Sequence, residues 1–435
     1  MSSLFFDDEE FKNVYISAIE RLNTDPILQG RKESSLYFGF EDINELRNAK
    51  VINWDDDPEI EDWQDVIQKD ESTTIQCSHF KSDWGYNSKQ EEGIDVPNHE
   101  IIGFYELEEN SKIINNLELI HPKLYLQRVT LDGTEIAMFE NFLLDLQLRD
   151  SNVKVGLNTD HSFLFSYKLL KAKHPEPLSY DSFIQISGSE LELEECRTIC
   201  KTFIFELNCF SGLALTPSPN KPSAIVDAEY DDYLEARQMQ LKEFGILTRN
   251  FLVCSDTVKV IEIFNRAISC EDSELSILYF SKVIEYVSET VVRMKITEVG
   301  RKVLSSNRAL MPDANFIKEL QDVFKSLSYK KDSESTELTI QTCCYINDLA
   351  EIIPEYIKNK FEKYRKQSDQ AALEFLAKCI SATRNNIAHA KSNYVATGNE
   401  MPEQHYEGFA QLMRVVSQQC IRWYSAQSPS MRIVS

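Results

Sequence analysis

The chain has 435 residues, 42% of them hydrophobic, and a formal net charge of −24 at pH 7. This length is sufficient for two or three domains with substantial cores, and no run of about 18 apolar residues suggests a transmembrane helix. The first ten residues lack the basic segment and apolar core of a signal peptide, and ten scattered cysteines are typical of reduced thiols. We therefore expect a cytoplasmic protein without membrane partners.

The negative charge is confined to one part of the chain. Residues 1–250 contain 23 Lys and Arg against 47 Asp and Glu, whereas residues 251–435 contain 23 of each. An acidic surface repels nucleic acid, so the first part is not expected to be an RNA-binding platform. It could instead meet a basic partner, restrain the neighbouring domain, or simply keep the protein in solution.

Residues 1–100 are predicted to form an acidic N-terminal segment that is folded but rich in loops. Apolar residues at helical spacing predict one amphipathic helix over residues 7–22. Residues 55–63 read as an acidic loop that leads into a short helix. Three tryptophans in this segment, Trp54, Trp63 and Trp84, are more than a disordered tail usually carries.

From residue 101 the hydrophobic pattern changes to a two-residue period. Residues 124–130 and 135–139 flank an Asp-Gly pair, which predicts a hairpin. Further strands are expected at 163–167 and 182–186, followed by a helix over 191–213. The proline-rich stretch 216–223 is the clearest linker or exposed loop.

Beyond residue 250 the pattern indicates helices almost throughout. Ser255 or Asp256 is expected to cap the first helix, and Asp272 or Ser273 the second, which should bury Leu275 with the rest of its apolar face. The remaining helices are expected over the ranges 314–328, 337–366, 369–392 and 402–426.

These patterns predict an α+β N-terminal part with antiparallel strands, followed by an all-α helical bundle. The expected domains are the acidic segment 1–100, an α+β sensing or regulatory domain over 101–250, and a helical domain over 251–435.

One octapeptide, residues 383–390 with the sequence TRNNIAHA, combines the groups that metal-free RNA cleavage requires. His389 titrates near neutrality and can move a proton, and the Arg384 fork can hold a phosphate. Asn385 and His389 are four residues apart and share a helix face. Arg384 and His389 are separated by about 140° around the axis, so one regular helix does not bring them together.

The helical half resembles the HEPN family, a bundle fold shared by many prokaryotic defence and toxin ribonucleases. The resemblance depends on Arg384-Asn385, three further residues and His389, and on an earlier helix, 278–285, that carries an internal Glu285. It covers roughly residues 255–425. Together with the N-terminal half, the chain looks most like ApeA-type abortive-infection proteins.

The resemblance implies a cytoplasmic, metal-independent endoribonuclease that needs no cofactor and acts as a homodimer or higher homo-oligomer in anti-phage defence. Two motifs would face each other across a twofold axis and form one composite site. His389 would take the proton from a ribose 2′-OH, Arg384 would stabilise the phosphoryl oxygens, and Asn385 would hold the phosphate or the histidine tautomer. Asn386 and Lys391 would add RNA contacts. The RNA, with tRNA as one candidate, would be cut after a phage-derived protein triggers the acidic half.

Two basic clusters could guide RNA towards this motif. The first surrounds the end of the predicted helix 337–366, where basic and aromatic residues alternate. Its members proposed to bind RNA are Lys363, Arg365 and Lys366. A second set consists of Arg293, Lys295, Arg301, Lys302 and Arg308. Both sets could equally be solvated helix faces.

Other interpretations remain open at this stage. Arg384 and His389 could be a salt-bridge partner and a helix-terminal cation, or the bundle could be a non-catalytic oligomerisation or ligand-binding module. A third possibility is nucleotidyl transfer to a tyrosine such as Tyr394. No metal site is expected, because the closest thiols, Cys196, Cys200 and Cys209, lack a histidine partner and are better explained as core residues.

Overall fold

The computed structural model describes the chain in segments. These are residues 5–6, 8–24, 43–51, 66–67, 72–83, 86–131, 142–148, 151–158, 161–171, 183–212, 214–217, 252, 256–328, 332–388 and 396–432. The chain divides into two compact units, one of residues 1–196 and 216–246 and the other of residues 197–215 and 247–435. Within these segments no helix combines the length and the apolar character needed to cross a membrane.

The first unit begins with a small parallel sheet, in which β1 (Phe5–Phe6) lies between β2 (Lys50–Val51) and β3 (Val66–Ile67). The predicted first helix is confirmed as α1 (Glu9–Thr24), and α2 (Ile43–Asn48) packs against it. Phe11 and Tyr15 on the buried face of α1 form an aromatic group with Phe6 of β1, with ring centroids 5.5 to 5.8 Å apart. The expected acidic loop and the three tryptophans lie outside the described residues.

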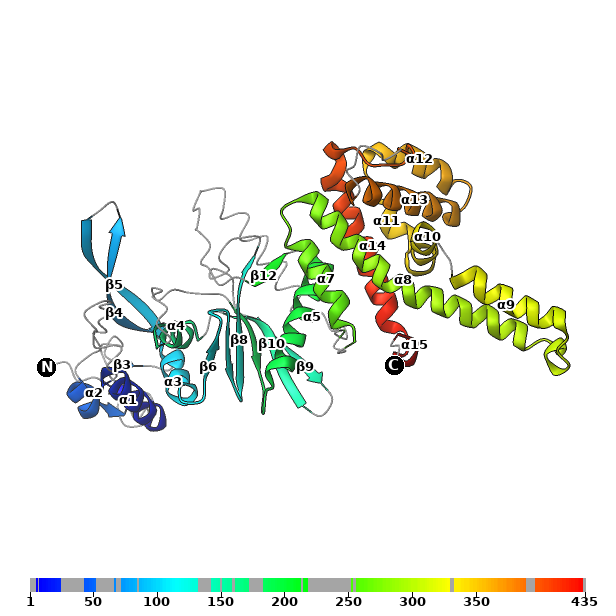
Figure 1. Ribbon diagram of the computed structural model, residues 1–435. Helices are drawn as coiled ribbons and strands as arrows, with labels where there is room; N and C mark the ends of the chain where they lie inside the picture. Colours follow the sequence, from blue (N-terminus) through cyan, green and yellow to red (C-terminus); the bar gives the residue numbers. More distant parts are fainter. Residues whose placement is uncertain are drawn as a thin grey trace. The chain divides into compact units, whose positions relative to one another are not determined.

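The expected antiparallel sheet is present in this unit (Figure 1). Its strands run in the order β6-β7-β8-β11-β10-β9, and every neighbouring pair is antiparallel. The bounds are β6 Lys112–Ile114, β7 Glu118–His121, β8 Leu124–Leu131, β9 Phe142–Leu148, β10 Ser151–Asn158 and β11 Phe183–Ser187. β12 (Leu215–Pro217) also pairs with β8, so the predicted linker at 216–223 starts inside a strand. A separate hairpin joins β4 (Ser72–Asp83) to β5 (Tyr86–Pro97).

One strand prediction in this region is wrong, and one lies partly outside the described residues. The first strand of the expected hairpin, 124–130, is present as β8, which pairs with β7 and with β11, whereas its predicted partner 135–139 lies outside the described residues. Residues 163–167 belong to the helix α4 (Ser162–Lys171). Leu164 and Phe165 are adjacent and both buried, and burial recurs one turn later, which a strand with alternating faces would not produce.

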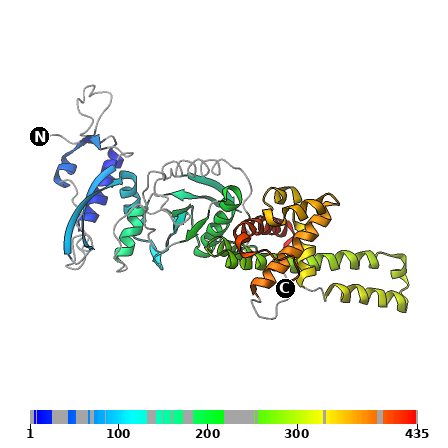
Figure 2. The same ribbon diagram turned by 90° about the horizontal axis from the view of Figure 1, so that it is seen from above.

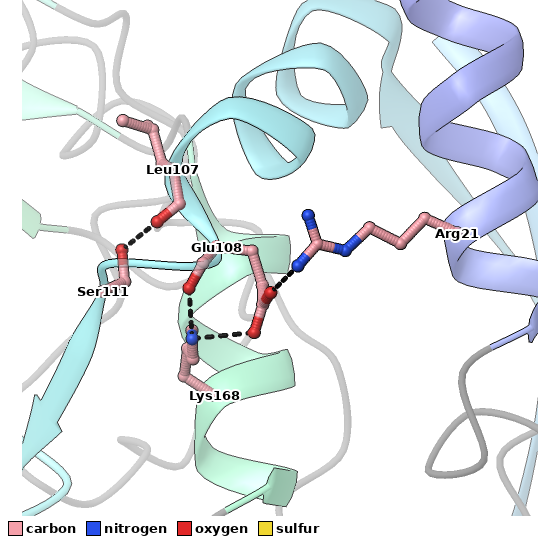
Figure 3. Close-up of polar contacts among 5 residues, drawn as sticks. All are labelled: Arg21, Leu107, Glu108, Ser111 and Lys168. Carbon is pink, nitrogen blue, oxygen red and sulfur yellow. Dashed lines mark hydrogen bonds and ion pairs between the residues drawn. The ribbon is translucent and has the colours of Figure 1, made fainter.

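A buried carboxylate joins α1, α4 and α3 (Asn98–Leu107) (Figure 3). The Glu108 side chain is 4% exposed and forms ion pairs with Arg21 and with Lys168, whose Nζ lies 2.8 Å from Oε1. Lys168 also donates to the backbone carbonyl of Glu108, and Ser111 donates to that of Leu107 at 2.6 Å, so polar side chains satisfy the end of α3. Two cations thus compensate one buried negative charge.

The second unit is the predicted helical bundle (Figures 1 and 2). It contains α5 (Leu193–Ser211) from Arg197 onward, α7 (Val258–Ile268), α8 (Ser273–Leu304), α9 (Ala314–Ser328), α10 (Asp332–Cys343), α11 (Ile346–Ala350), α12 (Glu355–Arg365), α13 (Asp369–Ala388), α14 (Tyr406–Ala426) and α15 (Pro429–Arg432). Short 3-10 turns cover Asn307–Leu310 and Glu403–His405. α8 packs against α7, α9, α10, α13 and α14, and apolar residues of α7, α8, α10, α13 and α14 form one core. Figure 2 shows the C-terminal half of α8 beside α9 as an extended hairpin.

Three details of the helical predictions need correction. The N-cap of α7 is Thr257 rather than Ser255 or Asp256, and Asp256 instead forms an ion pair with Arg432 at 3.0 Å. Asp272 does cap α8, since its Oδ1 accepts from the backbone N–H of Glu274 at 2.7 Å. Leu275 in the first turn is nevertheless 47% exposed, because the core-facing positions begin with the next two residues.

The long helix predicted over 337–366 is also wrong, because the chain breaks there into α10, α11 and α12. Tyr345 has an extended backbone, and its N–H donates to the side chain of Gln419 at 2.8 Å instead of continuing a helix. Pro354, which has no N–H to give, is the N-cap of α12. The other bounds agree closely with expectation, since α9 spans 314–328 and α14 ends at 426.

Candidate functional site

Arg384 and Asn385 lie in the last turns of α13, as the motif predicts, whereas His389 and Lys391 lie outside the described residues. α13 extends to Ala388 because its apolar residues face the core of the bundle continuously from Ala372 to Ala382. Beyond that point the helix carries partly exposed residues, among them both motif residues. Arg384 and Asn385 therefore lie at the edge of the core, where their polar groups can reach solvent.

Arg384 is held by two contacts that fix its direction. One guanidinium nitrogen, Nη2, lies 2.8 Å from Oε1 of Glu285 on α8, and the other, Nη1, donates to Oδ1 of Asn385 at 2.9 Å. The side chains of Arg384 and Glu285 are 27% and 44% exposed, so the ion pair is accessible to a ligand from solvent. The amide of Asn385 thus serves as an acceptor for the arginine in the described structure.

A small cleft opens beside this ion pair between α8, α10 and α13. The space that it encloses is about 20 Å³, room for about one water molecule. The lining residues are polar except for one isoleucine: Ser281, Glu285, Asp332, Ser333, Thr336, Ile380, Ser381, Arg384 and Asn385. A cation, two carboxylates, an amide and several hydroxyls therefore meet at one opening, a combination that offers hydrogen bonds to a sugar hydroxyl and one cation to a phosphate.

The hydroxyls of this cleft differ in how they are satisfied. Ser281 donates to the carbonyl of Ile277 at 2.8 Å, and Thr336 donates to that of Asp332 at 2.9 Å. The hydroxyl of Ser381 is buried and makes no hydrogen bond to any described residue. Because Ser381 precedes Asn385 by one helical turn, it continues the polar stripe of the motif into the cleft.

Asn386 lies on a different side of α13 from this cleft. Successive residues of a helix are rotated by about 100°, and the Asn386 side chain hydrogen-bonds Tyr406 at the start of α14. Burial raises the pKa of Tyr406, and the hydrogen bond from Asn386 partly opposes that shift. The predicted RNA contact of Asn386 is therefore not brought together with Arg384 and Asn385.

The segment after the motif returns to α13 through a defined anchor. The backbone N–H of Met401 donates to the buried hydroxyl of Thr383 at 2.9 Å, next to Arg384. Just before it, the carboxylate of Glu400 accepts from the N–H groups of Thr397 and Gly398, and Gly398 has the positive φ of 80° that glycine tolerates best. The described parts on both sides of residues 389–395 are thus fixed to the bundle close to the motif.

The predicted basic cluster of Lys363, Arg365 and Lys366, here called the α12 basic cluster, lies at the far end of α13 from Arg384. α12 ends beside the start of α13, and the 15 residues from Asp369 to Arg384 span about 22 Å of helix. Lys363 and Lys366 are exposed, whereas Arg365 is 3.1 Å from the side chain of Asn347 and 3.6 Å from that of Glu362. Phe361 is fully buried, so it offers no stacking surface.

The second basic set is largely engaged within the protein. Lys295 and Lys302 form ion pairs with Glu298, which lower its pKa, and Arg308 pairs with Glu319 at 2.8 Å. Arg293 donates to backbone carbonyls near the end of the described chain. These contacts favour a solvated, internally paired helix face.

Metal and thiol chemistry receive no support near the motif. The described residues contain no group of three or more His, Cys, Asp or Glu side chains arranged to hold a metal ion. Cys196 and Cys200 are buried, and burial raises the pKa of Cys196 to about 12, as expected for core thiols.

Sequence reasoning missed most of the cleft. Glu285 was associated with the fold but not with Arg384, and α10 was not expected to contribute a wall. The available signal was weak: Ser281 and Glu285 are four residues apart on α8, as are Ser381 and Asn385 on α13, so each pair marks a polar interruption of an apolar helix.

Comparisons with known proteins leave the chain without an assigned family. No protein-family model, no curated protein and no solved structure matches it.

Proposed function

We propose that this protein is a metal-independent endoribonuclease of the HEPN type that cleaves RNA at a composite site containing Arg384, Asn385 and His389. The observation that carries the proposal is the presentation of Arg384 at a hydroxyl-lined cleft. The arginine is partly exposed, and Glu285 and Asn385 fix its direction. A structural arginine would need no such opening beside it.

In the proposed reaction His389 accepts the proton of a ribose 2′-OH, and the oxygen attacks the adjacent phosphorus. The bond to the 5′ oxygen of the next nucleotide breaks, and the proton taken by His389 passes to this oxygen through water, which leaves a 2′,3′-cyclic phosphate and a 5′-OH end. Arg384 stabilises the negative charge that grows on the phosphoryl oxygens. Because Arg384 and His389 diverge on a regular helix, a second copy of the chain is needed to bring the base and the cation to the same phosphate.

The same proposal assigns a regulatory role to the acidic first unit. Its excess of carboxylates disfavours RNA, so it is suited to sensing a protein trigger, for which we propose a phage-derived component. RNA cleavage would then halt infection.

The proposal is tested by incubating the purified full chain with tRNA and total RNA in EDTA. The variant His389→Ala should lose cleavage, and the wild type should produce cyclic phosphate ends. His405→Ala is the matched control, since it removes an imidazole from the same unit that stacks on Tyr356 with ring centroids 5.4 Å apart. Equal cleavage by all three proteins, or loss of the wild-type activity in EDTA, would contradict the proposal.

A non-catalytic ligand-binding or oligomerisation module is the second candidate, and the Arg384–Glu285 ion pair is the observation in its favour. A carboxylate that already neutralises the arginine is suited to hold α13 on α8 without any substrate. This candidate predicts no RNA ends with cyclic phosphate and an unchanged biological effect of His389→Ala.

A further inference from the structure

The end of α12 carries cations that face solvent. The α12 basic cluster, Lys363, Arg365 and Lys366, occupies the last turn and the C-cap of this helix. Lys363 and Lys366 are exposed, and neither forms an ion pair with a residue that the structure describes. Arg365 contacts Glu362 and Asn347, but its side chain remains 34% exposed, so part of the guanidinium fork also reaches solvent.

An aromatic side chain lies between these cations in the sequence. Tyr364 stacks on Phe375 of α13, with ring centroids 5.0 Å apart and an interplanar angle of 20°. Phe375 is buried, whereas Tyr364 is 37% exposed. Because Phe375 covers one face of the Tyr364 ring, the exposed area belongs to the opposite face and the ring edge. The stack thus fixes the orientation of a ring that is open to solvent on one side.

A second tyrosine is joined to the cluster through α11. Arg365 donates to the side chain of Asn347 at 3.1 Å, and Tyr345, the N-cap of α11, lies two residues before Asn347. Tyr345 is 76% exposed, although its backbone N–H donates to Gln419 on α14 at 2.8 Å. Its ring therefore contributes little to the core and is presented to solvent from an anchored backbone.

We infer that these two tyrosines and the α12 basic cluster, here called the α11–α12 surface, bind single-stranded RNA. The cations attract the phosphates, and the tyrosine rings stack on unpaired bases. The bases of an RNA duplex are stacked on each other, so only a single strand can use both kinds of contact. The choice of RNA as the ligand rests on the proposed function, in which Arg384 at the other end of α13 stabilises a phosphate.

The position of the α11–α12 surface determines what it contributes. About 22 Å of helix separates it from Arg384, so it does not touch the reacting phosphate. It holds a part of the strand that is distant from the cleavage point, and only a strand long enough to reach both places gains affinity from it. Because every base has a face that can stack, this contact adds affinity without selecting a sequence.

The test measures the binding of fluorescently labelled RNA by anisotropy. The full chain carries His389→Ala as the parent variant, so that the RNA stays intact. A single strand should bind more tightly than a duplex of the same length. Tyr345→Ala should weaken binding of the single strand by about 5- to 100-fold, because it removes stacking on one base. Tyr345→Phe keeps the ring and should bind like the parent.

Tyr356→Ala is the matched control. Tyr356 is also exposed, at 51%, but it stacks on His405 and lies in the first turn of α12, away from the basic cluster. Both tyrosines are exposed, so neither alanine variant removes a core residue. Salt separates stacking from charge: Tyr345→Ala should lower the affinity by the same factor at every salt concentration, with an unchanged log–log slope.

The inference is overturned if Tyr345→Ala binds the single strand like the parent, or if Tyr345→Phe loses as much affinity as Tyr345→Ala. Polyglutamate that competes as strongly as RNA would also overturn it, because that result indicates an acidic protein partner. Weakened binding by Tyr345→Ala beside a wild type that cleaves no RNA would support the inference and contradict the nuclease. Cleavage by the wild type beside normal binding by Tyr345→Ala would do the reverse.

Discussion

The Arg384→Ala variant distinguishes a catalytic role of Arg384 from a structural one. The exposure of the ion pair limits how much it can contribute to the free energy of folding. The side chains of Arg384 and Glu285 are 27% and 44% exposed, so solvent screens their attraction. Pairs of this kind are worth about 0–1 kcal/mol. The Arg384→Ala protein should therefore unfold in urea with a free energy within about 1 kcal/mol of the wild type.

The expected effect on catalysis is much larger than that bound. Removing a group that stabilises transition-state charge typically costs about 100- to 1000-fold in rate, or about 3–4 kcal/mol. Single-turnover cleavage of a labelled RNA with enzyme in excess measures this loss without a contribution from product release. We expect the rate to fall at least 100-fold while the urea midpoint changes little.

Glu285→Gln is the matched control, because it removes the charge of the same ion pair, keeps an amide oxygen that can still accept a hydrogen bond from Arg384, and leaves the guanidinium in place. If Arg384 acts in catalysis, this variant keeps most of the cleavage rate. The reasoning is refuted if Arg384→Ala cleaves RNA within a few-fold of the wild type, or if the two variants lose equal activity in parallel with equal loss of stability.

Three further outcomes follow from the described contacts. Thr383→Val leaves the buried N–H of Met401 without its acceptor and should lower the free energy of unfolding by about 1–3 kcal/mol in urea titrations, whereas Thr383→Ser should retain the hydrogen bond. Neutralising the two lysines of the α12 basic cluster should reduce the salt dependence of RNA binding by about 0.7 per lysine in log–log slope. Substrates too short to span the ~22 Å to Arg384 should show no change. Burial raises the pKa of Cys379 from 9.0 to about 12, so an unfolded chain ionises first and stability should fall between these values. The slope is about 1.4 kcal/mol per pH unit for this thiol, and urea midpoints measured from pH 8 to pH 11 should decline less steeply in Cys379→Ala.

Local patterns predicted the bundle well wherever apolar spacing and capping agreed. α9 has the expected bounds, α14 ends at the expected residue, and Asp272 caps α8 as its position indicated. The predictions failed where a local pattern was ambiguous. The apolar run at 163–167 suits either a strand or a buried helix, and only its continuation to Leu169 on the same face distinguishes the two.

The site was predictable only along α13. Arg384 and Asn385 could be identified from the octapeptide, but the pairing of Arg384 with Glu285 joins residues 99 positions apart, and no local rule contains that information. The first turns of α10 line the cleft, and the chain breaks after α10 at Tyr345, whose backbone N–H donates to Gln419 on α14. A cleft wall of this kind arises from packing between helices that are far apart in the sequence.

Under the proposed function, the Arg384–Glu285 ion pair affects how RNA binding responds to salt. When an exposed lysine binds an RNA phosphate, small ions that were associated with the lysine or with the RNA are released. This release makes binding weaken as the salt concentration increases. The counterion of Arg384 is instead Glu285, a residue of the same chain. An RNA phosphate that reaches Arg384 therefore replaces a carboxylate oxygen with a phosphate oxygen. This contact therefore releases no small anion from the protein and tests the fit of the phosphate rather than its charge alone. The salt dependence of binding and the geometric selectivity of the cleft are thereby assigned to different residues of the same unit.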